Sequence, residues 1–320
     1  MTNEKRELGK TGIQITPIGL GMMEFSGGGG LLGFAFPSIS QEEKNATVRA
    51  ALEGGINWFD TAELYGLGVS EASLAGGLKA AGATNQDVVV ATKWWPLFRS
   101  AGNIPRTIHD RLRHLDGYPI GLYMVHQPYS FSSPEAEMDA MAALVEAGKI
   151  RSVGVSNFSA QRMRQAHDRL QKHGLPLAAN QVEYSLLDRS IETDGILDTA
   201  KELGVTIIAY TPLASGLLSG KYHKNPELLK KKNIYWRSKI QGGLEKSRPI
   251  VQALEEIGAR YNATPAQVAL NWLIHVHGDL VVTIPGVTHR RQAEESAGAM
   301  LFKLAPDEMA RLDELSRSYR

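Results

Sequence analysis

Cysteine is absent from the 320 residues of this chain. Its absence excludes disulfide bridges, thiolate metal ligands and cysteine nucleophiles, but it says little about the cellular compartment. No apolar run reaches the roughly 18 residues that a membrane-spanning helix needs. The first six residues are charged and have no apolar centre, so we expect no signal peptide and a cytoplasmic protein.

Net charge is also nearly absent, because 35 basic residues balance 34 acidic ones and leave a formal charge of +1. This balance gives no electrostatic reason to expect nucleic acid or an anionic membrane as a partner. Apolar residues make up 43% of the chain and charged residues 22%, which is typical of a globular protein with a large core. The length suits one α/β barrel, so we expect a single domain over residues 1–320.

Two glycine patterns that bind nucleotides are missing as well. A glycine run at 27–30 and an apolar patch at 31–36 predict a long loop, which we interpret as a linker because no GxxxxGK[ST] pattern is present. No GxGxxG pattern follows the first predicted strand. A doubly wound sheet therefore remains only as the alternative to a barrel.

What the sequence does contain is a repeated alternation of short apolar runs and amphipathic stretches. The runs predict eight strands, at 18–20, 56–59, 88–92, 120–125, 152–155, 179–182, 206–209 and 281–284. The stretches predict helices at 41–54, 70–81, 104–115, 134–147, 159–173, 191–203, 249–277 with a break near 264–265, 290–299 and 306–318. Two arms at 6–8 and 12–15 predict a hairpin before the first strand. Together they predict a (β/α)8 TIM barrel with an N-terminal β-hairpin and a C-terminal extra helix.

Three consecutive predicted strands end in polar residues of different chemistry. Asp60 follows the second strand, Lys93 the third and His126 the fourth, while Tyr65 lies in the loop after Asp60. Each residue also has an ordinary structural explanation. Asp60 could cap a helix and Tyr65 could pack its loop. Lys93 could be a solvated strand end, and His126 could start a turn. Because barrel enzymes carry their reactive groups at the carboxyl ends of the strands, we interpret the four as one candidate catalytic site.

These four side chains suit the reduction of a carbonyl group. A tyrosine hydroxyl has a pKa near 10, too high for an efficient proton donor at neutrality, and a nearby ammonium lowers it. Asp60 would hold Lys93 charged, and Lys93 would polarise Tyr65 so that it protonates a developing alkoxide. His126 would donate a hydrogen bond to the carbonyl oxygen. The reaction needs a bound hydride donor.

Several segments of the chain resemble the aldo-keto reductase family. They are FDTAELYG at 59–66, ATK at 91–93, YMVH at 123–126, GVSNF at 154–158, YTPLASGLLSGK at 210–221 and IPG at 284–286. The resemblance extends from about residue 6 to residue 299 and is most similar to plant-type and cyanobacterial-type members, some of which reduce pyridoxal. It implies a nicotinamide cofactor extended across the mouth of the barrel.

The resemblance also implies which residues contact that cofactor. Ser156, Asn157 and Gln181 would hold the carboxamide, and Tyr210 would stack on the nicotinamide ring. The remaining implied contacts are Gly21, Met22, Thr211, Pro212, Leu213, Ser215, Leu217, Lys221, Gly286, Thr288, Gln292, Glu295 and Ser296. Without the resemblance, these positions are equally well explained as turns, strand ends, core aromatics or a solvated loop lysine. Ser296 departs from the asparagine that many members have.

Arg290 and Arg291 stand where a helix is predicted to begin. Cations oppose the dipole at a helix N-terminus, so an anion shared between them would explain the pair. An adenosine 2′-phosphate meets that requirement, which favours NADPH over NADH. The alternative is two solvated arginines.

Aromatic residues follow two of the candidate catalytic positions. Trp94 and Trp95 come directly after Lys93, and Tyr129 comes shortly after His126. We expect them to form a substrate rim for planar or apolar carbonyl compounds, such as aromatic aldehydes or a pyridine aldehyde. We expect Met22 to add an adaptable surface. The alternative is that these side chains pack the loops against one another.

The sequence therefore predicts an NADPH-dependent aldo-keto reductase acting on a small-molecule carbonyl substrate. An alternative from another class is a cofactor-binding regulatory subunit resembling the potassium-channel β-subunits. No His and carboxylate spacing typical of a metal site is present, so no metal is expected. The physiological substrate is open, and so is the oligomeric state, for which a homo-oligomer is one option.

Overall fold

The structure is a computed structural model that describes residues 4–27, 38–231 and 234–320. The apolar patch expected at 31–36 and most of the glycine run before it lie outside these residues. Within the described part of the chain, no helix is both long enough and apolar enough to cross a membrane.

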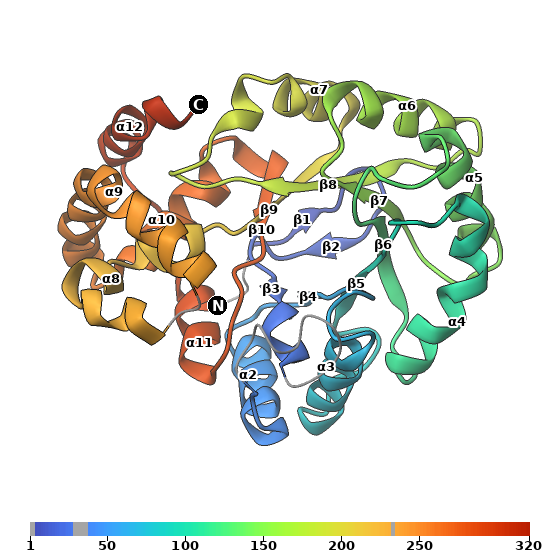
Figure 1. The fold of residues 1–320 in the computed structure, drawn as a ribbon, viewed down its shortest axis with the longest axis horizontal. Helices are drawn as coiled ribbons and strands as arrows, with labels where there is room; N and C mark the ends of the chain where they lie inside the picture. Colours follow the sequence, from blue (N-terminus) through green and yellow to red (C-terminus); the bar gives the residue numbers. More distant parts are fainter. Residues whose placement is uncertain (1–3, 28–37, 232–233) are drawn as a thin grey trace.

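The described residues form an eight-stranded parallel sheet in which every strand pairs with its neighbours in chain order. The strands are β3 (Leu20–Gly21), β4 (Trp58–Asp60), β5 (Val89–Trp94), β6 (Ile120–Val125), β7 (Val153–Ser156), β8 (Leu177–Glu183), β9 (Thr206–Tyr210) and β10 (Val281–Thr283). The amide of Gly19 donates to the Thr283 carbonyl at 2.9 Å, and that of Gly21 donates to the Pro285 carbonyl at 3.0 Å. These bonds join the first strand to the last, so the sheet closes into the predicted barrel (Figure 1).

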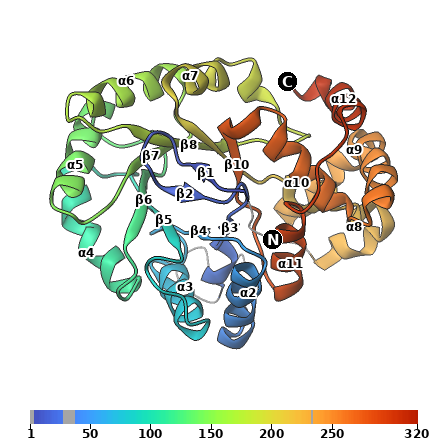
Figure 2. The same cartoon turned by 180° about the vertical axis from the view of Figure 1, so that it is seen from behind.

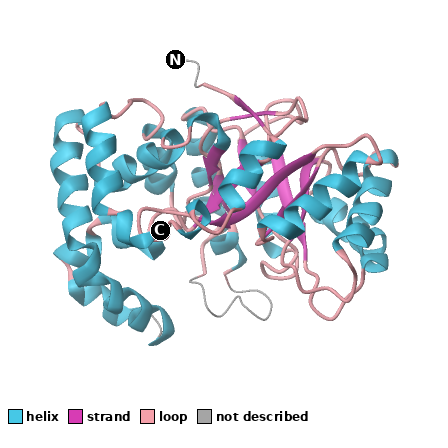
Figure 3. Cartoon of the chain, turned by 90° about the horizontal axis from the view of Figure 1, so that it is seen from above, coloured by secondary structure: helices cyan, strands magenta, loops and turns pink. Residues whose placement is uncertain are grey.

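Helices surround the barrel in the order expected from the sequence (Figures 1 and 3). They are α2 (Gln41–Glu53), α3 (Val69–Ala80), α4 (Ile104–His114), α5 (Pro134–Glu146), α6 (Ala160–Gln171), α7 (Ile196–Leu203), α8 (Lys221–Lys224), α9 (Ile234–Tyr261), α10 (Pro265–His275), α11 (Arg290–Gly298) and α12 (Pro306–Leu315). The predicted break at 264–265 is confirmed, because Thr264 caps α10 through a hydrogen bond from the Gln267 amide.

Two predicted helix starts are wrong. The helix expected from residue 191 begins only at Ile196, because Gly195 has a φ of +85°, outside the helical region. The helix expected from Pro249 begins at Ile234, and Pro249 lies inside α9. A proline removes one backbone hydrogen bond and usually marks a helix start. Here the buried side chains of Ile250 and Leu254 hold the following turns in place.

The N-terminal hairpin covers the amino-terminal end of the barrel (Figure 2). It consists of β1 (Arg6–Glu7) and β2 (Gln14–Ile15), which pair antiparallel. Its apolar side chains join a buried cluster with inward-facing residues of the strands, including Trp58, whose indole N–H donates to the Thr16 carbonyl at 2.8 Å. The hairpin closes this end of the barrel and leaves the carboxyl-terminal end for a site.

Candidate active site

Asp60 and Lys93 form a buried ion pair at the carboxyl ends of β4 and β5, as the sequence predicts. The Lys93 ammonium also donates to the Thr61 carbonyl at 3.0 Å, and Gln181 Nε2 donates to Asp60 Oδ2 at 2.9 Å. Burial raises the pKa of Asp60 and lowers the pKa of Lys93, whereas the ion pair opposes both shifts. The ion pair with Asp60 therefore favours the charged form of Lys93 although this side chain is buried.

Tyr65 lies above this ion pair. The Lys93 Nζ atom is 5.1 Å from the centroid of its ring. Burial, followed by the carboxylates of Asp60 and Glu24, raises the pKa of Tyr65 well above its usual value. The net direction of the pKa is therefore opposite to the expected lowering, because lost hydration and two carboxylates raise it. The hydroxyl stays protonated throughout the neutral range.

His126 lies between two aromatic rings. Its imidazole meets the ring of Tyr65 edge-on at 5.6 Å and that of Trp95 edge-on at 5.4 Å between centroids. Burial, and then the charge of Lys93, lowers the pKa of His126 well below its usual value, so the imidazole is neutral. Among the described residues its buried Nδ1 has no hydrogen-bond partner.

The four residues expected to hold the nicotinamide form one chain of hydrogen bonds. The Tyr210 hydroxyl donates to Asn157 Oδ1 at 3.0 Å, and Asn157 Nδ2 donates to Ser156 Oγ at 3.1 Å. Ser156 Oγ in turn donates to the Gln181 carbonyl at 3.0 Å. Because the Gln181 amide also donates to Asp60, these four residues are connected through hydrogen bonds to the Asp60–Lys93 ion pair.

The loop after β9 has an unusual backbone. Thr211, Ala214 and Ser215 all have a positive φ, a conformation that side chains disfavour and that clusters at ligand-binding sites. Gly216 has a φ of +90°, which favours glycine, and its Cα lies close to the end of the Lys221 side chain. Pro212 and Leu213 belong to the same loop. The side chain of Leu217 is buried in a separate cluster and anchors it.

Arg290 and Arg291 differ in their partners at the start of α11. The Arg290 Nε donates to Glu294 at 2.6 Å, one turn along the helix, and its amide donates to Glu43 at 2.8 Å. Among the described residues, Arg291 makes no ion pair. The expected pair sharing one anion is thus unequal, because carboxylates already engage Arg290.

The remaining residues assigned to the adenosine end have neighbours within the protein. Gln292 Oε1 accepts from the Thr288 amide at 2.7 Å and places an acceptor oxygen at the helix start. Glu295 accepts from the Thr264 hydroxyl at 2.6 Å, which ties α11 to α10, and Ser296 is buried.

Gly21 and Gly286 lie side by side where the barrel closes. Both are placed at the mouth, as expected for cofactor contacts. Met22 follows Gly21, but its side chain is fully buried in the core. The expectation of an adaptable methionine surface there is therefore wrong.

The aromatic residues expected at the mouth divide into two groups. Trp95 packs on His126, and Tyr129 is 59% exposed. Trp94 is fully buried and donates its indole N–H to Asn103 at 2.9 Å, on the helix side of the barrel. Successive side chains of a strand point to opposite faces, so with Lys93 inside, Trp94 points outward. The assignment of Trp94 to the substrate is corrected accordingly.

Sequence reasoning missed two carboxylates beside the site. Glu63 Oε2 accepts the amide of Trp95 at 3.1 Å, and its position between Asp60 and Tyr65 was a signal that could have identified it. Glu24 lies against Gly286, since a Cβ there would be 2.5 Å from Glu24 Oε1. Glu24 carries no local signal, because it comes close only through the fold.

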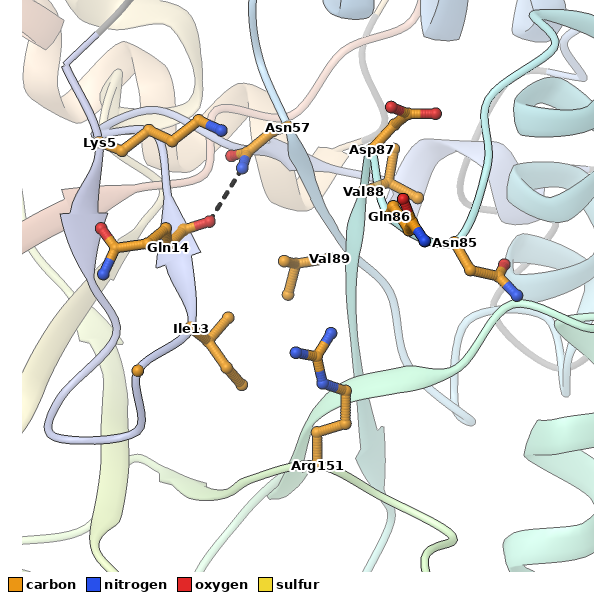
Figure 4. A pocket seen from close by; sticks show the side chains of 11 residues that line it. Lys5, Ile13, Gln14, Asn57, Asn85, Gln86, Asp87, Val88, Val89 and Arg151 are labelled. Carbon is orange, nitrogen blue, oxygen red and sulfur yellow. Dashed lines mark hydrogen bonds between the residues drawn. The ribbon is translucent and has the colours of Figure 1, made fainter.

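A cavity of about 360 Å³ lies at the other end of the barrel, beside the hairpin (Figure 4). Arg151 points into it between Ile13 and Val89, and Asn57 Nδ2 donates to the Gln14 carbonyl at 2.9 Å on its wall. None of the predicted site residues lines this cavity. In the described part of the chain, no group of three His, Asp or Glu side chains is placed to hold a metal ion.

Comparison with known proteins supports the resemblance. Residues 17–317 match the aldo/keto reductase family. The chain is 33% identical over 314 residues to a chloroplastic pyridoxal reductase of Arabidopsis thaliana, covering 94% of this chain and 83% of that protein. It is 35% identical over 286 residues to aldo-keto reductase str7 of Strobilurus tenacellus, covering 87% and 82%.

Solved structures give the same picture. A thermostable aldo-keto reductase in complex with the inhibitor epalrestat superposes with a TM-score of 0.77 at 31% identity, covering 98% of this chain and 99% of that one. An aldo-keto reductase from Klebsiella pneumoniae in complex with NADPH superposes with a TM-score of 0.74 at 25% identity, covering 99% and 96%.

Proposed function

The chain belongs to the aldo-keto reductase family of oxidoreductases, and we propose that it reduces aldehydes or ketones to alcohols with NADPH, with Tyr65 as the proton donor. The observation that carries this proposal is the buried Asp60–Lys93 ion pair beneath Tyr65, beside a neutral His126. We also propose that residues 1–320 act as one domain, since the site takes side chains from strands all around the barrel.

The residues around the mouth suit a reduced nicotinamide, which supplies the hydride when bound. Asn157 and Gln181 carry the amide donors and acceptors that a carboxamide needs, and Tyr210 offers a ring beside them. The strained loop at 211–217 and Lys221 suit the pyrophosphate. Arg291 suits the 2′-phosphate, because no carboxylate among the described residues engages it.

The proton comes from Tyr65. As the carbonyl carbon gains a hydride, its oxygen becomes an alkoxide and takes the hydroxyl proton of Tyr65. The phenolate left behind is stabilised by the Lys93 ammonium, 5.1 Å from the ring centroid. Asp60 keeps Lys93 charged, and a neutral His126 donates its ring N–H to the carbonyl oxygen. Stabilising the phenolate is the same effect as lowering the pKa of the hydroxyl, so the Lys93 ammonium opposes the rise in the Tyr65 pKa that burial and the carboxylates cause.

Trp95 and Tyr129 favour planar or apolar carbonyl substrates. Because one relative is named as a pyridoxal reductase, pyridoxal belongs in the first substrate panel, beside aromatic and aliphatic aldehydes.

The test is a substrate panel on the purified chain with NADPH and with NADH, following nicotinamide oxidation and identifying the alcohol product. We expect turnover with NADPH that depends on the carbonyl compound and is lost in Tyr65→Phe. Tight cofactor binding without turnover of any carbonyl would reject the proposal and favour the regulatory-subunit alternative.

A further inference from the structure

A buried network of charges lies behind the two loops that carry Tyr65 and Trp95. The Arg99 guanidinium donates to Glu63 at 2.6 Å, and Arg111 lies 3.3 Å from the same carboxylate. Arg111 also pairs with Glu71 at 2.9 Å. Three of the four side chains are almost fully buried, and only Arg99 is partly exposed. The network thus balances two carboxylates against two guanidinium groups.

Glu63 is the member of this network that meets the active site. Its backbone amide donates to the Lys93 carbonyl at 3.1 Å, and its side chain accepts the amide of Trp95 at 3.1 Å. It also lies two residues before Tyr65. The Glu63 side chain therefore joins the loop after β4 to the loop after β5, which is the strand that carries Lys93.

The surroundings of His126 depend on this connection between the two loops. Its ring contacts Tyr65 on one loop and Trp95 on the other, both edge-on. Trp95 is held in this place at its backbone by Glu63, while Arg99 holds the far end of the same loop to the same carboxylate. If that carboxylate loses its charge, both attachments of the loop weaken, because a neutral side-chain oxygen is a poorer acceptor, and Trp95 is held less firmly against His126.

We propose that Glu63 is a positioning residue for the reaction, which holds Trp95 against His126 so that the imidazole stays shielded from water and aimed at the carbonyl oxygen. Glu63 does not touch the reacting atoms, so it acts through Trp95. This inference rests on the proposed carbonyl reduction, but the position of Trp95 is a property that is measured without turnover.

Glu71 provides a matched control. It is a buried glutamate of the same network, but its carboxylate bonds to Thr92 Oγ1 at 2.6 Å and to Arg111, away from Trp95. Glu63→Gln and Glu71→Gln therefore make the same chemical change in the same network. Only the first one weakens the support of Trp95.

The experiment compares both variants with the wild-type protein in kcat, KM, NADPH dissociation constant, pH-rate profile and thermal stability. For Glu63→Gln we expect kcat to fall about tenfold or more, with NADPH affinity nearly unchanged, because a small displacement of an oriented group is costly. We also expect the acid limb of kcat/KM to move to higher pH, because a more solvated His126 loses part of the burial that lowers its pKa. Glu71→Gln should lose stability without moving this limb.

A histidine-selective NMR titration gives a second measurement that needs no substrate. The pKa of His126 should be higher in Glu63→Gln than in the wild type and in Glu71→Gln. If Glu63→Gln does not fold, Arg99→Met provides the same test through the more exposed partner, with a smaller shift in the same direction. Equal kinetic losses in both glutamine variants, or an unmoved His126 titration, would overturn the proposal. Absence of wild-type turnover would overturn the proposed function and leave the NMR test valid.

Discussion

Gln181 and Asp60 are 121 residues apart in the chain, yet the Gln181 side-chain amide donates a 2.9 Å hydrogen bond to the Asp60 carboxylate. This bond occupies the carboxylate oxygen that does not face Lys93. It also ends the chain of hydrogen bonds that begins at Tyr210. The groups proposed to hold the cofactor and those proposed to move the proton are thereby fixed relative to one another, which favours a preorganised site.

Tyr65→Phe should lower kcat for carbonyl reduction by at least about 10²-fold, because it removes the only proposed proton donor. NADPH affinity should be retained. Tyr123→Phe is a matched control, since the Tyr123 hydroxyl is buried and has no hydrogen-bond partner in the described structure. Steady-state kinetics and a cofactor titration check both variants. Near-normal kcat in Tyr65→Phe would assign the proton to another group.

Arg291→Ala should weaken NADPH by roughly ten- to a hundredfold and leave NADH nearly unchanged, because a charge-assisted phosphate contact contributes about 1.5–3 kcal/mol. Arg290→Ala is the control and should have the smaller effect, since Arg290 is already paired with Glu294. Fluorescence titration with both cofactors measures the difference. Equal weakening of NADPH and NADH by Arg291→Ala would contradict a 2′-phosphate contact.

Lys93→Met and Asp60→Asn should move the pKa of Tyr65 in opposite directions. Removing the ammonium takes away the stabilisation of the phenolate, so the pKa rises and the limb of alcohol oxidation moves to more alkaline pH. Removing the Asp60 carboxylate takes away one of the causes that raise the Tyr65 pKa, so the limb moves to lower pH as long as Lys93 remains charged in the variant.

The check is a pH-rate profile of alcohol oxidation on variants that remain folded by circular dichroism. If the limb of the oxidation pH-rate profile is unchanged in both variants, the ion pair only stabilises the ends of the two strands. Shifts in the same direction would show that the two charges do not act on Tyr65 independently.

Glu137 should make the protein less stable as the pH rises. It is fully buried on α5, and burial raises its pKa to about 7. Because the folded-state pKa lies above that of the unfolded chain, the stabilisation is complete below about pH 4.5 and is lost as the pH rises through about 7.

Glu137→Gln should abolish this dependence on pH. At pH 8 the variant should have a higher melting temperature than the wild type, and its free energy of unfolding should be larger by up to about 3 kcal/mol. Thermal melts between pH 5 and pH 8 measure it. Parallel curves for the wild type and the variant would contradict a raised pKa at this position.

The sequence by itself determined the barrel and the order of its strands. Short apolar runs bounded by glycines and polar residues are typical of strands in a buried parallel sheet. The predicted bounds of β6 agree with the structure at both ends. Because parallel strands end at one edge, it also followed that Asp60, Lys93 and His126 would meet. The helix start at Arg290 was likewise located from local pattern, whereas the loop after β9 was assigned through the family resemblance.

Only the tertiary structure decided which way neighbouring side chains point and which partners they find. Trp94 and Trp95 are adjacent in sequence, yet the pleat and the barrel wall send one into the core and the other onto His126. The partners of Arg290, the closeness of Glu24 to Gly286 and the raised pKa of Tyr65 depend on groups that are remote in the chain. Local pattern carries periodicity and backbone preference, whereas burial and charge depend on everything that packs around a residue.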